Sequence, residues 1–494
     1  MQPSDGAGRL PAQTDIAIVG AGIAGLNMAI ALKQAGYEDV LVIERADEVG
    51  GTWEANTYPG CQCDIPSNLY SYSFAPKPDW SRTFPSQPEI WAYLRKVADD
   101  FGVRPHIRLG CELIEAVWEE PERSWRLETS LGSTRARLLI PAIGNLCEPS
   151  IPDVPGLESF EGAAFHTARW DHDHDLSGRR VAVVGTGASV IQVVPNIQPQ
   201  VASLTVFQRT PPWIFPQRIR QVRSGEQRLF RLLPAAQRAV RAVSFWPREF
   251  MTSRLTHRRM GVVFSSAARM HLKREVADPE LRRKLTPDYA VGCKRMLLSG
   301  EYYPALQKAN VELIAEAVAE VRPDGVVSAN GHERKVDTII WGTGFRTARM
   351  PIGNLIRGRE GRLLDDVWLE NGTRALRGTA IAGFPNLFLL GGPNTVPGAN
   401  TAIYLIESQV RYVLDAVRKM DARGARVVEA RQEAVDTFNE MIQRATAGTV
   451  WVSGGCRSWY LDHNGHNTML WPGTCRAFRR ATERFDPAEY LAHA

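Results

Sequence analysis

A glycine-rich turn between a β-branched run and a helical stretch occurs twice in this chain, and this repeat constrains the fold most. The first copy occupies 15–45, DIAIVGAGIAGLNMAIALKQAGYEDVLVIER. The second begins at 179 with RRVAVVGTGASVIQVVP and ends with the strand SLTVFQR at 203–209. A strand, such a turn, a helix and a second strand form the unit that binds a dinucleotide. The sequence therefore predicts an α/β fold with two Rossmann-like dinucleotide-binding domains and two bound nucleotides.

The first turn matches G-x-G-x-x-G with Gly20, Gly22 and Gly25. The first glycine permits the tight turn, and the second lets the backbone approach a pyrophosphate at the helix N-terminus. The third allows the helix to pack closely on the strand. Glu44 ends the next strand, where a carboxylate accepts hydrogen bonds from ribose hydroxyls. This combination favours FAD at the first site.

The second turn keeps Gly185 and Gly187 but has Val190 in place of the third glycine. We expect this change to loosen the helix packing without removing the phosphate contact. The residue equivalent to Glu44 is Arg209, and each lies 24 residues after the first glycine of its turn. An acid there would repel a 2′-phosphate, whereas Arg can bind one through paired hydrogen bonds. The second site is therefore predicted to bind NADPH.

Length and composition place the chain among ordinary globular proteins of more than one domain. It has 494 residues, of which 44% are hydrophobic and 23% charged, and its net charge of +5 is too small to indicate nucleic-acid binding. The first fifteen residues lack the apolar core of a signal peptide. The longest uncharged run, 16–32, contains three glycines and predicts strand, turn and helix rather than a membrane span. We expect a cytoplasmic protein whose seven cysteines are reduced.

Two further apolar strands with glycines, DTIIWGTGF from 337 and NLFLLGGPN from 386, follow the second unit. We therefore expect a discontinuous FAD-binding domain at 1–148 and 337–494. The NADPH-binding domain is expected at 149–336, with a helical subdomain inserted at about 211–290.

The inserted segment is strongly basic. Residues 211–290 hold seventeen Lys and Arg against six Asp and Glu, and Leu, Phe and Val recur there at helical spacing. The favoured interpretation is a solvated helical subdomain whose arginines extend into water. The alternatives are attraction for a phosphorylated cofactor or acidic substrate, and contact with an anionic membrane surface.

Two longer motifs narrow the prediction. GGTWEANTYPGCQCD at 50–64 matches [AG]-G-x-W-x4-[FY]-P-[GM]-x3-D, and FEGAAFHTARWD at 160–171 matches F-x-G-x3-H-x3-W-[PD]. With these motifs the chain resembles the type I Baeyer–Villiger monooxygenases of the flavin-containing monooxygenase superfamily. The resemblance covers nearly the whole chain and includes three shorter matches: FQRTP at 207–211, GCKR at 292–295 and CRSWY at 456–460.

The resemblance implies an enzyme that uses NADPH and O2 to insert one oxygen next to a ketone carbonyl through a C4a-peroxyflavin, giving an ester or lactone. Besides the first turn, it places FAD beside Glu44, Gly51, Thr52, Trp53, Asp64 and Tyr70. It places NADPH beside Gly185, Thr186, Gly187, Ala188, Ser189, Val190, Ile191, Arg209, Thr210 and Lys294. It also implies a C-terminal lid at 453–473 with Trp459 near substrate or cofactor. Gln62 stands where many members have Arg, which predicts a weaker contact to the nicotinamide half.

The resemblance assigns catalysis to Arg295 and Asp64. An anionic oxidant in a dry pocket needs a fixed cation, and Arg stays protonated at any working pH. Asp64 would pair with Arg295 and hold it in place. The same cation can stabilise the oxyanion of the adduct, while bound NADP⁺ keeps water out. Movement of the two nucleotide domains is expected between hydride transfer and oxygenation.

His166, in the stretch that joins the two domains, is interpreted as a hinge residue that forms interdomain hydrogen bonds rather than as a base. The neighbouring D-H-D-H-D at 171–175 alternates along an extended chain without a cysteine. It favours a polar interdomain turn over a metal site, and no metal is expected.

Three alternative functions stay open. An N- or S-oxygenating flavin-containing monooxygenase shares both turns but uses a protonated, electrophilic oxidant. A flavoprotein disulfide reductase needs a redox pair, typically C-x4-C, for which Cys61 and Cys63 lie too close together. A nucleotide-binding scaffold without activity conflicts with the presence of both Asp64 and Arg295.

Overall fold

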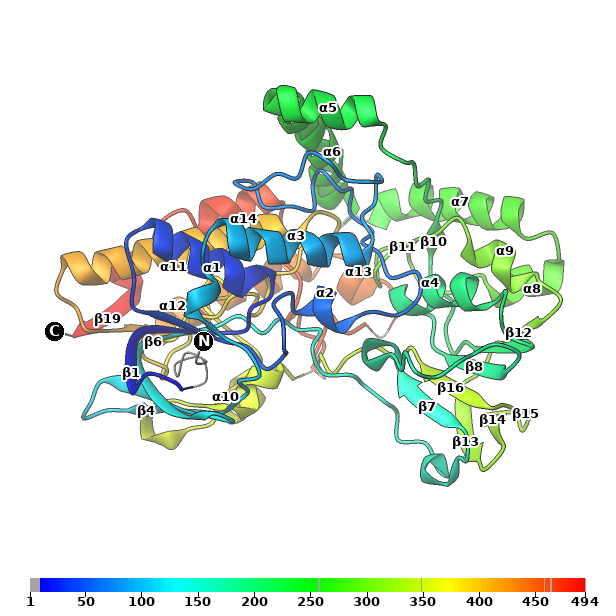
Figure 1. The fold of residues 1–494 in the computed structure, drawn as a ribbon, viewed down its shortest axis with the longest axis horizontal. Coiled ribbons are helices and arrows are strands. Elements are labelled where there is room, and N and C mark those ends of the chain that lie inside the picture. Colours follow the sequence, from blue (N-terminus) through cyan, green and yellow to red (C-terminus); the bar gives the residue numbers. More distant parts are fainter. Residues whose placement is uncertain (1–8, 256–257, 348, 457, 463, 494) are drawn as a thin grey trace, which may run out of the picture.

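The computed structural model of the protein describes residues 9–255, 258–347, 349–456, 458–462 and 464–493. Two sheets organise it. In Figure 1 the first, with β1, β4 and β6, lies to the left, and the second, with β8, β12 and β16, lies to the right. In each sheet, one strand leads into one of the two glycine-rich turns predicted from the sequence. The expected α/β fold with two dinucleotide-binding domains is therefore confirmed.

The first sheet has seven strands in the order β17-β4-β5-β6-β1-β2-β3. Its strands are β1 (Gln13–Val19), β2 (Val40–Ile43), β3 (Ile107–Arg108), β4 (Leu113–Glu119), β5 (Ser124–Thr129), β6 (Gly132–Pro141) and β17 (Ile356–Arg357). Both faces of β1 are buried, since Ile16 and Ile18 pack into one apolar cluster and Ala17 and Val19 into another. A parallel strand covered on both faces explains the continuous apolar run that precedes the first turn.

Helices pack on the first sheet and on one another beside it. They are α1 (Ile23–Gln34), α2 (Thr52–Ala55), α3 (Gln87–Asp100), α10 (Leu364–Asn371), α11 (Ala402–Ala422), α12 (Gln432–Thr446), α13 (Val450–Ser453) and α14 (Cys475–Ala481). The C-terminal strands β18 (Val427–Ala430) and β19 (Tyr490–His493) pair antiparallel. Later parts of the chain contact the first sheet again, since β17 pairs with β4 and the Leu139 N–H of β6 donates to the Asn386 carbonyl at 3.0 Å.

The second sheet is parallel throughout, in the order β12-β9-β8-β16-β7. Its strands are β7 (Ala163–His166), β8 (Arg180–Val184), β9 (Ser203–Phe207), β12 (Val311–Ile314) and β16 (Thr338–Trp341), and α4 (Ala188–Ile197) follows the second turn. An antiparallel sheet of β13 (Val318–Arg322), β14 (Gly325–Ser328) and β15 (Glu333–Lys335) follows β12.

The expected boundary at 337 is wrong by one strand. Thr338–Trp341 was predicted to begin the second part of the FAD-binding domain, but it forms β16 and pairs with β7 and β8 in the second sheet. The chain leaves that sheet at 342–347, where it runs beside the outgoing segment. Pro149 and Phe345 form an antiparallel bridge, and the Ser150 N–H donates to the Gly344 carbonyl at 2.9 Å. The two domains are thus connected by two segments that run side by side, one at 149–150 and the other at 344–345.

Helices fill the basic insertion, as expected. They are α5 (Ser224–Leu232), α6 (Pro234–Leu255), α7 (Arg258–Glu275) and α8 (Pro279–Lys284), and α9 (Tyr302–Leu306) lies beyond them. The short strands β10 (Ile214–Phe215) and β11 (Leu297–Leu298) pair on either side of the four helices. Figure 1 shows α5 and α6 standing out from the upper edge of the molecule. Within the described residues, no helix combines the length and the apolar character needed to cross a membrane.

Val190 does not loosen the packing of α4, contrary to expectation. Its side chain is fully buried and fills the space above Gly342, at the end of β16. A Cβ atom added to Gly342 would lie 2.1 Å from Val190 Cγ2. The close packing that a glycine at position 190 would allow is provided instead by Gly342, at the end of the neighbouring strand.

This exchange predicts the effect of a substitution. Gly342→Ala should lower the free energy of unfolding by about 1–3 kcal/mol, because a stiff, fully buried valine has no space to move into. Adding Val190→Ala should restore most of the loss in a urea titration. Gly187→Ala, whose new Cβ would meet nothing within 4 Å, is the control. Independent, additive losses for Gly342→Ala and Val190→Ala would contradict this packing.

Candidate functional site

The first glycine turn is held in shape by close backbone contacts. Gly20 has φ +103°, and a Cβ on Gly25 would lie 1.8 Å from the Gly20 carbonyl oxygen, so neither position accepts a side chain. Glu44 is buried at the end of β2, and its Oε2 accepts the Ala21 N–H at 2.6 Å. The acid predicted to hold a ribose therefore also fixes the turn. Its position at the mouth of the turn is compatible with both tasks.

The GGTW segment lies directly on this turn. The Gly50 N–H donates to the Ala21 carbonyl at 3.1 Å, and a Cβ on Gly22 would come within 3.5 Å of Gly51 Cα. Thr52 and Trp53 begin the short helix α2. Trp53 Nε1 donates to the Tyr70 hydroxyl at 3.0 Å, with the two rings edge to face. The structure thus brings together the residues predicted around the flavin: Gly20, Gly22, Gly25, Glu44, Gly51, Thr52, Trp53 and Tyr70.

Asp64 and Arg295 meet across 231 residues of sequence. Arg295 Nε donates to Asp64 Oδ2 at 3.0 Å, and its Nη2 donates to Oδ1 at 2.8 Å and to Oδ2 at 2.7 Å. The Asp64 carboxylate raises the pKa of Arg295, although burial opposes this effect. The Arg295 side chain keeps 40% of its surface accessible. A fixed, permanently charged guanidinium is therefore both held in place and open to a bound molecule.

Tyr460 also lies at this ion pair, and sequence reasoning missed it. Burial raises its pKa to about 12, and Asp64 adds to the rise while Arg295 opposes it. The neutral phenol therefore remains at any working pH. Trp459 stacks at a tilt on Tyr460, with ring centroids 4.7 Å apart, and packs into the same apolar cluster. The CRSWY match contained the signal, but its spacing alone does not tell which aromatic ring faces the ion pair.

The second turn has the same geometry. Gly185 has φ +125°, and a Cβ there would lie 2.3 Å from the Gly342 carbonyl oxygen. A Cβ on Gly187 would meet nothing within 4 Å, which leaves room for a phosphate above the N-terminus of α4. Thr186 Oγ1 donates to the Thr210 carbonyl at 2.9 Å. This bond ties the turn to the end of β9, where Arg209 follows. The first turn of α4 is formed by Ala188, Ser189, Val190 and Ile191.

Arg209 and Lys294 form a cationic pair at the edge of this turn. Lys294 has a lowered pKa, first because it is partly buried and next because Arg209 lies nearby. Its ammonium stands 5.0 Å from the centroid of the Tyr289 ring. Arg209 is exposed and Lys294 is half-buried. An anion would stabilise two neighbouring like charges, and a 2′-phosphate would fit this need.

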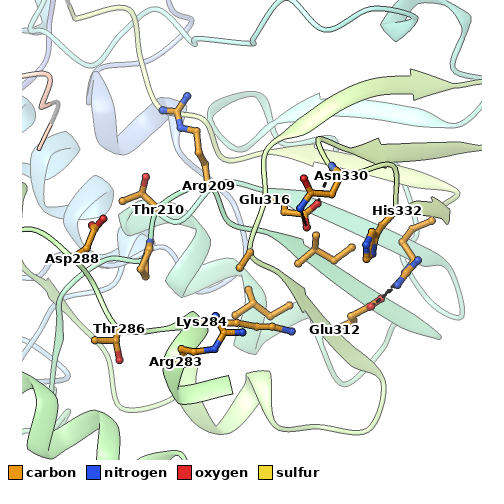
Figure 2. Close-up of a pocket in the computed structure, with 15 residues that line it drawn as sticks. Arg209, Thr210, Arg283, Lys284, Thr286, Asp288, Glu312, Glu316, Asn330 and His332 are labelled. Carbon is orange, nitrogen blue, oxygen red and sulfur yellow. Dashed lines mark hydrogen bonds and ion pairs between the residues drawn. The ribbon is translucent and has the colours of Figure 1, made fainter. Parts of the chain in front are cut away.

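A cavity of about 710 Å³ opens beside Arg209 and Thr210. Figure 2 shows Arg283 and Lys284 reaching into it from α8, while Glu312 and His332 line the opposite wall and Arg209 extends away from α8. Arg283 and Lys284 were not singled out in the sequence. Their only signal was the basic run LRRK at 281–284, which counts toward the charge of the segment but does not locate it.

Comparison with known proteins agrees with this arrangement. Residues 17–223 match the family model described as pyridine nucleotide-disulphide oxidoreductase. A Baeyer–Villiger monooxygenase of Streptomyces coelicolor is 47% identical over 96% of this chain and 92% of its own length. One of Pseudomonas aeruginosa is 45% identical over 99% of this chain and 93% of its own length. The chain belongs to the Baeyer–Villiger monooxygenase family.

Solved structures support the same fold for this monooxygenase. A closed crystal structure of cyclohexanone monooxygenase superimposes with a TM-score of 0.88 at 28% identity, covering 98% of this chain and all of the other. An oxidized steroid monooxygenase bound to NADP gives a TM-score of 0.86 at 31% identity and covers 98% of this chain and 99% of the other.

The expectation that all cysteines of the monooxygenase are reduced is wrong for two of them. Cys293 and Cys456 form a disulfide, which joins the loop carrying Lys294 and Arg295 to the C-terminal segment carrying Trp459. Cys61, Cys63, Cys111, Cys147 and Cys475 are free. The scattered spacing gave no indication of this pair, because 163 residues separate its members. The bond restrains both loops that surround Arg295.

His166 lies beside the double connection between the domains. Its Nδ1 accepts the Ala168 N–H at 3.0 Å, and its ring meets Phe345 of the returning segment edge to face, with centroids 5.8 Å apart. Burial lowers the pKa of His166, so the imidazole is neutral near pH 7. Among the residues that the structure describes, no contact joins His166 to Arg295 or Asp64. The hinge role stays a prediction, which this position supports.

The D-H-D-H-D stretch joins the domains instead of gathering ligands. His172 Nε2 shares a hydrogen bond with Thr57 Oγ1 at 2.7 Å, and His174 Nε2 shares one with Thr338 Oγ1 at 2.8 Å. The two imidazoles thus face opposite domains. Gln62, the departure from the family motif, also bridges the domains: its side chain donates to Gln217 at 3.4 Å, and its backbone N–H donates to Gln192 of α4 at 3.3 Å.

The number of reactive thiols tests whether this disulfide is present. Denatured without reductant, the protein should show five reactive thiols, and seven after reduction. Cys456→Ser should show six without reductant and lower the free energy of unfolding by roughly 2–4 kcal/mol, because the unfolded chain loses a long cross-link. Cys111→Ser, at a buried free thiol, is the control for side-chain loss. Seven reactive thiols in the unreduced protein would contradict the bond.

Proposed function

We propose that this monooxygenase holds FAD at the first turn and NADPH at the second, and inserts one oxygen atom of O2 next to the carbonyl of a small-molecule ketone. The product is an ester or lactone. The observation that carries the proposal is the Asp64–Arg295 ion pair, which sets an accessible cation beside the predicted flavin site. Family membership favours ketone oxidation over the N- or S-oxygenating alternative, in which a fixed cation has no comparable task.

The residues around the first turn fit FAD. Gly20 and Gly25 tolerate no Cβ and close the turn, Gly22 would let the backbone approach a pyrophosphate, and Glu44 lies where ribose hydroxyls would come. When bound and reduced by NADPH, FAD would activate O2 for the transfer of one oxygen atom. Trp53 and Tyr70 would wall the ring system, since their rings are locked together by a hydrogen bond. Burial raises the pKa of Tyr70 well above its usual value, so this wall stays uncharged.

Arg295 would stabilise negative charge on the oxygen atoms of the reacting molecules. Asp64 prevents the guanidinium from swinging out and keeps it charged, and the neutral Tyr460 lies nearby. Since these groups are fixed before the reaction begins, they need little reorganisation as charge develops on the carbonyl oxygen. Asp64 therefore acts as a positioning residue and Arg295 as the catalytic one.

Arg209, Thr210 and Lys294 would hold the 2′-phosphate and ribose of NADPH. The pKa of Lys294 is lowered mainly by its partial burial, and the nearby Arg209 lowers it further while Asp288 opposes this effect. We also place the enzyme in the cytoplasm, where NADPH is available. Disulfides such as Cys293–Cys456 are uncommon in that compartment.

Replacing the catalytic cation should separate the two halves of the reaction. Arg295→Ala should leave anaerobic flavin reduction by NADPH within about threefold, while ester formation falls by about 10²–10³-fold, the loss expected for one fixed transition-state donor. Arg322→Ala is a matched control, because Arg322 has a similar exposure of 43% and pairs with Glu320 and Glu333 far from the site. Near-normal ester formation by Arg295→Ala would overturn the assignment.

Coenzyme choice tests the second site. Arg209→Ala should lower the ratio of kcat/KM for NADPH over NADH by about ten- to a hundredfold, since a hydrogen bond to a charged phosphate is lost. The rate with NADH should change little. Arg334→Ala, at a cavity-lining arginine already paired with Glu312, is the control. An unchanged coenzyme ratio in Arg209→Ala would reject the phosphate contact.

A further inference from the structure

The three helices α5, α6 and α7 expose an unusual number of large apolar side chains. We define the α5–α7 patch by its exposed members: Leu229, Leu232, Leu233, Val240, Val243, Trp246, Val262, Val263 and Met270. Leu232, Val243 and Met270 each keep more than 70% of their surface accessible. α6 contacts both of its neighbours. Exposed apolar side chains gathered on neighbouring helices commonly mark a contact with another molecule.

The orientation of α6 is reversed relative to an ordinary surface helix. Residues 237, 241, 245, 249 and 252 recur every three or four positions and face the protein. Among them, Gln237, Glu249 and Thr252 are buried although polar. The outward side, half a turn away, carries Val240, Val243 and Trp246.

Specific hydrogen bonds fix this reversed orientation. Arg241 Nη1 donates to the carbonyls of Asn68 and Ser71 at 3.1 and 3.0 Å. Glu249 accepts the backbone N–H groups of Cys475 and Arg476 at 3.1 and 2.8 Å. Turning the helix to bury its apolar side would leave these charges without partners, at a cost of several kcal/mol. The apolar side is therefore held outward by the fold.

Positive charge surrounds the patch. Residues 224–275 contain eleven Lys and Arg but only three acids. Of these acids, Glu226 pairs with Arg220 and Glu249 is buried. Exposed cations flank the apolar residues, and they are Arg228, Arg231, Arg238, Arg269, Lys273 and Arg274. Arg476 adds one more, lying 5.1 Å from the ring centroid of Trp246.

We propose that the α5–α7 patch docks on the surface of an anionic lipid bilayer. Apolar side chains would enter the boundary between headgroups and acyl chains, and the surrounding cations would meet the lipid phosphates. A tryptophan beside an arginine suits this boundary, because the ring is apolar and the cation remains wet. A second copy of the chain is the other possible occupant. It would bring a second set of the same cations against the first, which opposes a two-fold contact.

Vesicle co-sedimentation of the FAD-loaded full-length protein tests the proposal. Phosphatidylcholine vesicles with about a third phosphatidylglycerol should bind the protein at low salt, whereas pure phosphatidylcholine should not, and salt should weaken the binding. Val243→Ser with Trp246→Ser should weaken vesicle affinity about tenfold or more. Arg228→Gln with Arg238→Gln should weaken it by about fivefold for each cation removed.

The control replaces exposed apolar residues elsewhere, Ile114→Ser with Leu131→Ser, and should leave vesicle binding unchanged. All variants should keep the wild-type melting temperature and NADPH consumption, since the changes are at the surface. Equal binding to neutral and anionic vesicles, or to neither, would overturn the proposal. So would a dimer in light scattering that Val243→Ser with Trp246→Ser dissolves, or heparin binding that persists while vesicle binding is absent.

Discussion

The bidentate contact between Asp64 and Arg295 is the interaction on which the rest of this structure depends. It joins a loop of the first domain to the segment before β11, so it forms only when the two nucleotide-binding units and the inserted helices are all in place. The Cys293–Cys456 bond and Tyr460 restrain the same region from the C-terminal side. A single charged group is thereby fixed by segments from three distant parts of the sequence.

Close backbone approach determines where the nucleotides can lie. At both turns the first glycine has a positive φ, and the adjacent chain leaves no room for a side chain. At the second site, helix α4 packs closely on the sheet without a third glycine, because Val190 lies over Gly342. Charge then distinguishes the sites, since one ends in Glu44 and the other in Arg209, which stands beside Lys294.

Much of this could be predicted from the sequence, because turns and their flanking strands are local. Gly20, Gly185, Glu44 and Arg209 follow from spacing, and Asp64 and Arg295 from the family motifs. What depends on the arrangement of distant segments was missed. The disulfide partners are 163 residues apart, β16 joins a sheet whose other strands precede it, and the outward side of α6 is set by contacts to residues 68–71 and 475–476. Local periodicity does not specify which face of a helix is covered.

The most direct test of the central claim is a double-mutant cycle on Asp64 and Arg295, read as the rate of ester formation with flavin reduction measured in parallel. If Asp64 acts only by holding the guanidinium, Asp64→Ala with Arg295→Ala should be no slower than Arg295→Ala alone, while Asp64→Ala alone should lose part of the rate. Losses that multiply in the double variant would contradict the account, because they would mean that the two side chains act independently.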